Sequence, residues 1–466
     1  MATIRFLGAA REVTGSCYLL STHGSSVLLE CGARQGREAE DTDREDHDDP
    51  LGGLGDIDAV ILSHAHLDHS GALPRLVRQG FQGPIYCTPA TADLLRVLLM
   101  DAVFLHLRDI QSENHWRERA GKPLLEPQYM PEDCEAVLKL CVEVGYGEAT
   151  VVSSDIALRF HDAGHILGSA IVELEISEKG KTRRVVFSGD LGNAESVLMP
   201  PPTAMESADV VLMEGTYGDR DHRPYIETVT EFAEALEAAH RDGGNVLIPA
   251  FAVGRTQEVL FHVARLHGTG KLRQSFVVLD SPMAIDVTQL YQRHRALLDP
   301  KDLAKLGGGG HFKQALDFLR LARTPEDSMA INRFQSGAII IAGSGMCEGG
   351  RIRHHFKHNL WRRQTHLIFV GFQAQGTLGR RIVDGAESVR LFGQDIAVKA
   401  QIHTLGGFSA HAGQAQLLGW ARHFKGKPRF HLVHGEEAAL SALQDAMRRT
   451  ARIESVVPRL NDVIEI

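Results

Sequence analysis

Apolar and polar positions follow two different rhythms along the chain. Up to about residue 213, short apolar runs alternate with turns, and the runs at 27–29 and 59–62 have the length of buried strands. One helix stands out in this part, because the leucines that follow Thr91 recur at helical spacing. The pattern predicts a first part built of mixed strands and helices.

From about residue 225 the pattern changes to strand, loop and helix, repeated four times. Each apolar run leads into a turn-rich loop, and a helical segment follows the loop. The four runs span residues 246–248, 276–279, 339–342 and 367–370. This order predicts a parallel α/β sheet, in which the loops that leave the carboxyl ends of the strands line the ligand crevice.

Several of these loops carry an arginine close to the start of the following helix. A helix amino terminus with an adjacent arginine is a favourable place for a phosphate. A solvated first-turn residue is the plain alternative for each of them, and the sequence leaves both interpretations open. The arginines are Arg255, Arg351, Arg353, Arg380 and Arg381.

Length and charge narrow the class of protein. A chain of 466 residues is too long for one ordinary core and predicts two or three domains. A net charge of −9 argues against a protein that coats nucleic acid non-specifically. The amino-terminal residues lack the layout of a signal peptide, and no apolar run approaches the roughly 18 residues of a membrane span. We therefore expect a cytoplasmic protein without membrane contact.

Three further features of the sequence carry no assigned function. The six cysteines are scattered without a C-x-x-C pair and are expected to be reduced thiols. The acidic segment 41–50 and the glycine run 307–310 are expected to be surface loops.

The strongest chemical signal follows the apolar run that ends at Leu62. Residues 63–69 read Ser-His-Ala-His-Leu-Asp-His, which puts three imidazoles and one carboxylate into a single short stretch. These groups cannot share one face of a strand or helix, but they can converge if the loop curls around a metal ion. Imidazole together with carboxylate favours zinc or another borderline divalent ion. A solvated histidine-rich turn is the alternative, and the position directly after a strand argues against it.

Two further ligand candidates, His165 and Asp190, stand in glycine-rich turns. One loop cannot complete two metal ions with four or five ligands each, so more ligands must come from elsewhere in the chain. Taken singly, each candidate is weak, because an aspartate between glycines is usually a turn residue.

The order and the contexts of these residues resemble the successive ligand motifs of metallo-β-lactamase-fold hydrolases. The resemblance implies two metal sites that share one aspartate. Glu30 precedes Cys31-Gly32 where the family usually has aspartate, a residue that supports the metal loop from behind the ligands. The implied ligands are His64, His66 and His165 for the first metal, Asp68 and His69 for the second, and Asp190 for both.

Later motifs resemble one branch of this superfamily. Residues 211–220 resemble the opening of the β-CASP insert, and residues 408–411 and 432–436 resemble the two histidine motifs that close it. The β-CASP family contains nucleic-acid-processing enzymes such as the pre-mRNA 3′-end endonuclease and ribonuclease J, and the match is to its stand-alone bacterial type. The resemblance implies an α/β protein, a metallo-β-lactamase αββα sandwich with an inserted β-CASP domain built on a parallel α/β sheet. The implied domains are 1–213 and 396–466 for the two lactamase parts and 214–395 for the insert.

Carried over residue by residue, the resemblance also implies roles for single side chains. His434 would complete the second metal, and Glu214 would hydrogen-bond His411 and orient it. Two positions depart from the family: Gly413, where aspartate is common, and Gly215, where the family has serine or threonine. The residues expected to contact substrate are Arg255, Ser344, Gly345 and Ser409.

The reaction that this resemblance implies is hydrolysis of the phosphodiester bonds of single-stranded RNA. Two zinc ions per chain, about 3.5–4 Å apart, would share a hydroxide that attacks phosphorus in line, with Asp68 and Asp190 among the catalytic groups. His411, held by Glu214, would protonate the leaving oxygen as general acid. The choice of RNA rests on His434, since the DNA-specific branch of the family has an apolar residue there.

Three other functions stay open at this point: hydrolysis of a small-molecule ester, DNA processing, and RNA binding without catalysis. The four strand-loop-helix units argue against the first, and the complete set of ligand positions argues against the last. The sequence also leaves open which divalent metal is native, which RNA is cut, whether cleavage is endonucleolytic or 5′-to-3′ exonucleolytic, and whether the chain forms a homodimer.

Overall fold

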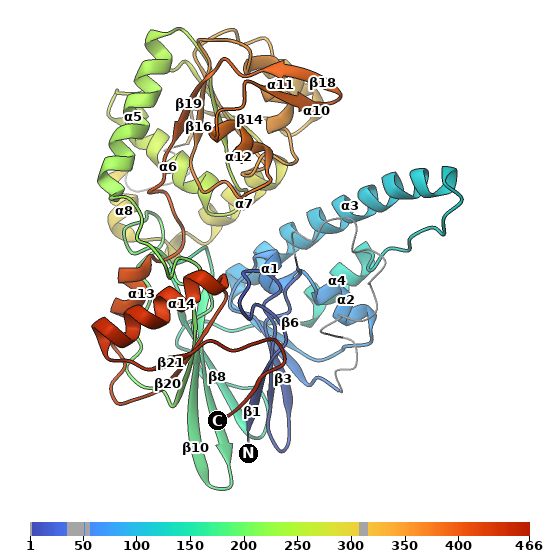
Figure 1. Ribbon diagram of the computed structural model, residues 1–466, viewed down its shortest axis with the longest axis vertical. Helices are drawn as coiled ribbons and strands as arrows, with labels where there is room; N and C mark the ends of the chain where they lie inside the picture. Colours follow the sequence, from blue (N-terminus) through green and yellow to red (C-terminus); the bar gives the residue numbers. More distant parts are fainter. Residues whose placement is uncertain (1, 35–50, 52–55, 307–315) are drawn as a thin grey trace. The chain divides into compact units, whose positions relative to one another are not determined.

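The computed structural model describes residues 2–34, 51, 56–306 and 316–466 (Figure 1). The chain divides into two compact units. The acidic segment 41–50 and the glycine run 307–310 lie outside the described residues. The domain borders that the sequence predicts, at 213/214 and 395/396, stay a prediction. The first unit comprises Met1–Ala194, Pro201–Asp221 and His411–Ile466, and the second comprises Glu195–Pro200 and His222–Ala410.

Two sheets face each other in the first unit. One has the strand order β22-β1-β2-β3-β4-β5-β6 and the other the order β21-β20-β11-β10-β9-β8-β7. The strands of the first sheet are β1 (Thr3–Phe6), β2 (Tyr18–Ser21), β3 (Ser26–Leu29), β4 (Ala59–Ile61), β5 (Ile85–Cys87), β6 (Cys141–Glu143) and β22 (Val463–Glu465). Those of the second are β7 (Thr150–Val151), β8 (Ile156–Asp162), β9 (Ala170–Glu178), β10 (Lys181–Phe187), β11 (Val210–Glu214), β20 (Arg429–Val433) and β21 (Ser455–Val456).

The core of the first unit lies between these sheets. Strand β8 alternates buried and half-buried positions, so that Phe160 points inward with its neighbours two residues away. The Tyr18 ring packs against both Phe6 and Phe187, at centroid distances of 5.8 and 5.4 Å. Each fully buried side chain of this kind stabilises the fold by about 1.5–3 kcal/mol. This packing fixes the strand ends from which the loops of the candidate site emerge.

Helices cover the outer faces of the two sheets (Figure 1). On the second sheet, Trp420 and Leu440 from two helices pack in one buried cluster with Met213 of β11. The helix predicted after Thr91 begins at Pro89, is capped by Thr88, and continues to Arg119, well beyond the leucine pattern. The helices are α1 (Leu67–Ser70), α2 (Leu73–Arg78), α3 (Pro89–Arg119), α4 (Pro131–Leu140), α13 (Gln414–Ala421) and α14 (Glu437–Ala446), the last followed by the π-helical turn η3 (Met447–Ala451).

The second unit is built on a parallel sheet with the order β14-β13-β15-β12-β16-β19. Four of these strands are the predicted apolar runs, and β14 and β19 join them at the two edges. Its strands are β12 (Val246–Pro249), β13 (Phe276–Asp280), β14 (Leu319–Leu321), β15 (Ala338–Ala342), β16 (His366–Phe369) and β19 (Gln401–Thr404), with a separate hairpin of β17 (Ser388–Leu391) and β18 (Gln394–Ala397).

Helices connect the strands of this sheet, as parallel pairing requires. They are α5 (Tyr225–Arg241), α6 (Arg255–Gly268), α7 (Pro282–Arg293), α8 (Pro300–Lys305), α10 (Pro325–Ile331), α11 (Ile352–Asn359) and α12 (Leu378–Val383), with a 3₁₀ turn, η2 (Arg295–Leu297). The predicted α/β class is therefore confirmed. Among the described residues, none of the helices combines the length and the apolar character needed to cross a bilayer.

Candidate metal centre

The loop after β4 is held in place by Glu30, which lies at the end of the neighbouring strand β3. The Glu30 carboxylate is fully buried and accepts hydrogen bonds from the backbone N–H of Ser63, at 2.6 Å, and from the Ser63 hydroxyl, at 3.0 Å. Its other contact is with His69, whose Nδ1 lies 2.5 Å from Oε2. The glutamate that replaces the usual aspartate therefore anchors both ends of the histidine-rich loop.

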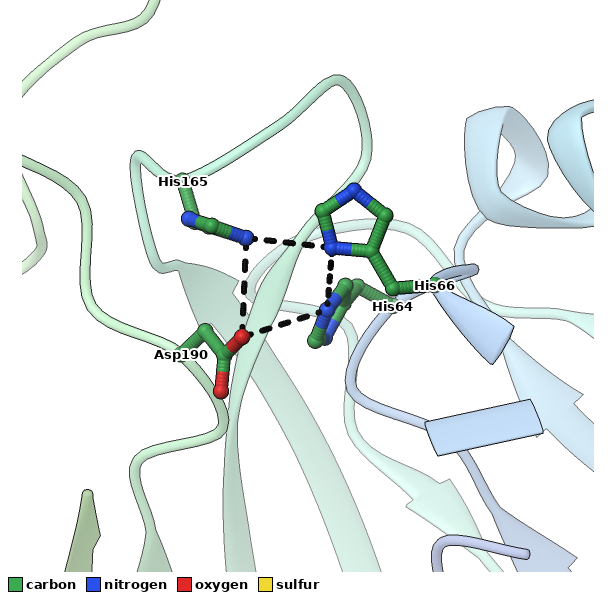
Figure 2. Close-up of side chains that lie close together, drawn as sticks. All are labelled: His64, His66, His165 and Asp190. Atoms are coloured by element: carbon green, nitrogen blue, oxygen red, sulfur yellow. Dashed lines mark hydrogen bonds and ion pairs between the residues drawn. The ribbon is translucent and has the colours of Figure 1, made fainter. Parts of the chain in front are cut away.

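A first cluster of possible ligands joins this loop to two others (Figure 2). The four side chains point toward one another, and Figure 2 shows the ring of close contacts between them. Nε2 of His64 lies 3.1 Å from Nδ1 of His66, and Nε2 of His165 lies 3.3 Å from the same atom. Oδ2 of Asp190 lies 3.5 Å from both His64 and His165.

Two of the three imidazoles of this cluster are in the form that binds metal. Burial lowers the pKa of His64 well below its ordinary value, and burial likewise lowers the pKa of His66. Both rings are therefore neutral at pH 7, and each keeps a nitrogen lone pair for a cation.

A second cluster is made by Asp68, His69 and His434. The Nε2 atoms of the two histidines lie 3.1 Å apart, and Oδ2 of Asp68 lies 3.5 Å from Nε2 of His434. Oδ1 of Asp190 lies 3.3 Å from His69 and 3.4 Å from His434. Asp190 therefore presents one carboxylate oxygen to each cluster, which is the arrangement of a bridging ligand.

Thr216 fixes the orientation of His434, a role that the sequence did not predict. The Thr216 hydroxyl donates to the His434 carbonyl oxygen at 3.2 Å and lies 3.1 Å from Nδ1 of the same residue. With the hydroxyl hydrogen on the carbonyl oxygen, Nδ1 donates the hydrogen of that second bond. The lone pair of the ring then sits on Nε2, which faces Asp68 and His69. The signal in the sequence was the position of Thr216 two residues after Glu214.

His411 lies beside both clusters and faces Glu214. Its Nδ1 is 3.5 Å from Oε1 of Glu214 and 3.9 Å from Oδ2 of Asp190. Glu214 is fully buried and is itself fixed, because it accepts hydrogen bonds from the backbone N–H groups of Leu191, at 2.7 Å, and Thr216, at 3.1 Å. Burial works against protonation of His411, but the Glu214 and Asp190 carboxylates outweigh it and raise the pKa of His411 to about 9.

The two glycines that depart from the family pattern have structural partners. A Cβ at Gly215 would lie 2.4 Å from Cδ2 of Leu440, so the leucine takes the space of the missing side chain. Gly413 is the N-cap residue of α13 and offers no side-chain cap, but Oδ1 of Asp221 accepts from the Ala415 N–H at 2.8 Å. Asp221 therefore does for α13 what an aspartate at position 413 would do.

Family comparisons agree with this geometry. Residues 10–250 match the model of the metallo-beta-lactamase superfamily, which is 250 − 10 + 1 = 241 of 466 residues and more than half of the chain. Residues 256–382 match the Beta-Casp domain, and residues 395–458 match the Zn-dependent metallo-hydrolase RNA specificity domain. The chain belongs to the β-CASP family of the metallo-β-lactamase superfamily. The resemblance inferred from the motifs is thereby confirmed, and so is the prediction of a metal-dependent hydrolase.

Similar proteins are known from bacteria and archaea. The β-CASP chain is 45% identical over 437 residues to Ribonuclease TTHA0252 of Thermus thermophilus, which covers 94% of both chains. It is 32% identical over 474 residues to Transcription termination factor FttA of Methanocaldococcus jannaschii, covering 99% of this chain and 71% of the relative. A crystal structure of a protein of unknown function from Enterococcus faecalis shares the fold over the whole of both chains, with a TM-score of 0.55 and 13% identity.

The residues predicted to contact substrate all belong to the second unit of this β-CASP protein. Arg255 is nearly buried and forms an ion pair with Glu258, which also accepts from the Tyr225 hydroxyl at 3.1 Å. This buried network accounts for the arginine without a phosphate. In the loop after β15, the Ser344 hydroxyl accepts from the Gly349 N–H at 3.2 Å and thereby closes the loop.

The other two predicted contact residues have restricted surroundings. A Cβ at Gly345 would lie 2.8 Å from the Phe251 ring, and Ser409 is buried. A role of Arg255, Ser344, Gly345 or Ser409 in substrate binding stays a prediction.

Proposed function

We propose that this protein is a zinc-dependent ribonuclease that hydrolyses phosphodiester bonds of single-stranded RNA, with two zinc ions per chain. The observation that supports it most is the position of Asp190, which presents one oxygen to each of two ligand clusters while His411 lies alongside.

The residues of both clusters fit divalent cations. In the first cluster the imidazole nitrogens approach one another to 3.1 and 3.3 Å, although a neutral ring carries only one N–H. Lone pairs that converge in this way are stabilised when a cation lies between them. Oδ1 of Asp190 is buried and accepts no hydrogen bond from the described residues, which leaves its charge for the same purpose. The first cluster offers three nitrogen ligands and a carboxylate, and the second offers two nitrogen ligands and two carboxylates, both of which are donor types that zinc binds.

Each residue then has a definite task. His64, His66 and His165 would hold one ion, Asp68, His69 and His434 the other, and Asp190 both. Such a pair of ions lowers the pKa of water to about 7 and neutralises charge that develops on the phosphate.

His411 supplies the proton that the leaving oxygen needs. Because Nδ1 faces Glu214, Nε2 is the ring nitrogen that delivers the proton to the substrate. The Glu214 and Asp190 carboxylates raise the pKa of His411 to about 9 without bound cations, which favours the protonated ring that a general acid requires.

RNA is the substrate that the comparisons favour. The match to an RNA specificity domain spans residues 395–458 and so includes both His411 and His434. One relative is named a ribonuclease and another a transcription termination factor, and these names concern those proteins. If the protein does not cleave RNA, the alternative substrates are a small-molecule ester and DNA. We also propose a cytoplasmic location, and leave the homodimer and the direction of cleavage as predictions.

Cleavage of a 5′-labelled single-stranded RNA beside the DNA of the same sequence tests the proposal. We expect the wild type to cut RNA in preference to DNA, and a chelator to stop the reaction. Asp190→Ala should lose cleavage, whereas Asp395→Ala, at an exposed aspartate of the β17–β18 hairpin, should keep it. A ladder of products would indicate endonucleolytic cleavage, and release of single nucleotides from the 5′ end would indicate exonucleolytic cleavage. Equal cleavage of both polymers, or of neither by a zinc-loaded protein, would contradict the proposed substrate.

A further inference from the structure

The outer half of α3 projects from the first unit (Figure 1). The inner half is anchored, with Leu94, Leu99 and Val103 buried against the unit. Beyond Val103 the helix exposes large apolar side chains, and residues 120–130 return alongside it toward α4. We call residues 104–130 the arm.

The arm has a defined internal structure. Asn114 pairs with Leu125 through two hydrogen bonds, one from Nδ2 to the carbonyl oxygen at 2.9 Å and one from the backbone N–H to Oδ1 at 2.7 Å. The His106 ring stacks on Tyr129 with centroids 4.9 Å apart and planes within 7° of parallel. These contacts fasten the return segment, residues 120–130, to the outer half of α3.

The tip of the arm, residues 113–122, combines an aromatic ring with cations. Trp116 is 63% exposed, and the guanidinium carbon of Arg119 lies 5.8 Å from the centre of its ring. Among the described residues, Arg119 and Lys122 have no ion-pair partner. Residues 113–122 carry three cationic and two acidic side chains, a charge of 3 − 2 = +1, in a chain whose net charge is −9, and one of the cations, Arg117, is paired with Glu113 at 3.1 Å.

A groove runs beside this tip. It has a volume of about 770 Å³ and lies between the helix and the return segment. Its lining includes Leu107, Gln111, Trp116 and Leu124. Its lining also includes the guanidinium of Arg108 and the carboxylate of Glu118. Apolar walls of this kind can take a flat ring such as a nucleobase.

We propose that the arm is a second contact for single-stranded RNA, with a base stacked on Trp116 and phosphates bound by Arg119 and Lys122. This inference rests on the proposed function, because the same strand would reach the metal centre. An exposed aromatic ring with cations on the same segment is how proteins bind single strands without reading their sequence. A positive tip on an acidic chain matches the charge of RNA and opposes that of a second copy.

The arm and the metal centre are linked by the same helix. At the start of α3, the hydroxyls of Thr88 and Thr91 donate to the carbonyl oxygen of Gly168, at 2.7 and 2.9 Å, in the loop that carries His165. The 116 − 89 = 27 residue steps from Pro89 to Trp116 span about 40 Å. A strand with the roughly 3.4 Å rise of stacked nucleotides would need about 12 nucleotides to cover this distance.

RNA length therefore gives the test. We would measure binding of 5′-fluorescein oligouridine of roughly 6 and 24 nucleotides, lengths on either side of that span, to the Asp190→Ala protein. The measurement is repeated with Trp116→Ala and with the double variant Arg119→Ala/Lys122→Ala added. Trp361→Ala is the matched control, because Trp361 is 51% exposed in the second unit and also has an arginine over its ring, at 5.1 Å.

We expect Trp116→Ala to weaken binding of the long RNA by about 5- to 150-fold and to leave binding of the short RNA unchanged. The double variant should lower the dependence of log Kd on log salt by about 1.4, or 0.7 for each lost phosphate contact. With the metal centre intact, Trp116→Ala should cut the short RNA at the wild-type rate, which also shows that it folds.

Three results would overturn the inference. Equal affinity of wild type and Trp116→Ala for the long RNA, beside normal cleavage, would remove the arm as an RNA contact and leave the proposed function intact. A change in oligomeric state in Trp116→Ala without a change in RNA affinity would make the arm a protein-binding surface. Wild-type protein that neither binds nor cuts any RNA would refute the proposed function itself.

Discussion

Replacing Glu214 by glutamine removes the negative charge that faces His411 while the side chain keeps its shape. Oε1 of Glu214 lies 3.5 Å from Nδ1 of His411. Two unit charges at that distance attract each other by about 1 kcal/mol if water screens them fully, and by about 5 kcal/mol at an effective dielectric constant of 20. At about 1.4 kcal/mol for each pKa unit, the pKa of His411 should fall by roughly 1 to 3 units.

The sign of the effect on the rate follows from the proposed role. A general acid acts in its protonated form, so activity is lost as the pH rises through its pKa. In Glu214→Gln the alkaline limb of kcat/KM should therefore move to lower pH by at least about one unit. At the acidic end of the profile, where both proteins hold the proton, the loss of activity should be smallest. Bound cations lower the pKa of His411 in both proteins, so the difference between the two profiles is the quantity to compare.

The assay is kcat/KM for a defined single-stranded RNA over a range of about pH 6–10. Glu454→Gln, at an exposed glutamate of the first unit, is the control for loss of one negative charge. The same substitution at Glu214 in a His411→Ala background should produce no further shift, because the group that titrates is absent. An unchanged alkaline limb in Glu214→Gln, or an equal shift in the His411→Ala background, would show that Glu214 does not act by raising the pKa of His411.

Three further substitutions test the support of the metal centre and of the core. Thr216→Val should weaken zinc binding by about 10- to 100-fold because His434 loses its orienting partner, whereas Thr216→Ser should keep the wild-type zinc affinity. The measurement is the amount of zinc retained against a competing chelator. Equal zinc retention in both variants would contradict the orienting role of Thr216. Gly32→Ala should lower the free energy of unfolding by about 1–3 kcal/mol, because the added Cβ would lie 1.8 Å from the Asp68 carbonyl oxygen in the metal loop. An unchanged urea midpoint would show that the loop can move aside. His431→Leu should raise stability by roughly 1–3 kcal/mol, because both nitrogens of this buried ring have no hydrogen-bond partner among the described residues. Burial lowers the pKa of His431 to about 4, so below about pH 6.5 the unfolded chain takes up a proton that the folded chain does not. The free energy of unfolding of the wild type should therefore fall between about pH 6.5 and about pH 4. Urea titrations at these two pH values should show a smaller fall in His431→Leu, and an equal fall would exclude His431 as its source.

The metal-binding loop was visible in the sequence because its chemistry is local. Three histidines and an aspartate stand within six residues after a buried strand, and a metal is the simplest way to bring them together. His165 and Asp190 needed the family resemblance, since each is ordinary by itself. The structure brings all of the predicted ligands into two clusters around Asp190.

Residues that act through distant partners could not be found in this way. Thr216 bonds His434, 218 positions later in the chain, and Asp221 caps a helix that begins 193 residues after it. Neither pairing leaves a periodic signal, because it depends on how separate strands and helices meet. At Arg255 a local pattern suggested a phosphate contact, and the structure shows Glu258 against the guanidinium; the contact with phosphate stays a prediction.

The hydrophobic pattern also did not predict how far α3 extends. Leucines at helical spacing marked its buried half, but the outer half packs on little besides its own return segment. Residues there are mixed in polarity and continue the helix through local propensity and pairs such as Arg117 with Glu113. The alternation of four strands and helices in the second unit, by contrast, predicted its parallel sheet, because both faces of such a sheet are covered and its inner strands are apolar along their length.

Anomalous diffraction at the zinc absorption edge, from crystals grown with zinc, tests the two-metal centre most directly. The account predicts two peaks, one among His64, His66 and His165 and one among Asp68, His69 and His434. Both should lie at about 2.0–2.2 Å from their ligand atoms and both should contact Asp190. A single peak, or two peaks of which one lies away from Asp190, would exclude a two-metal centre bridged by Asp190.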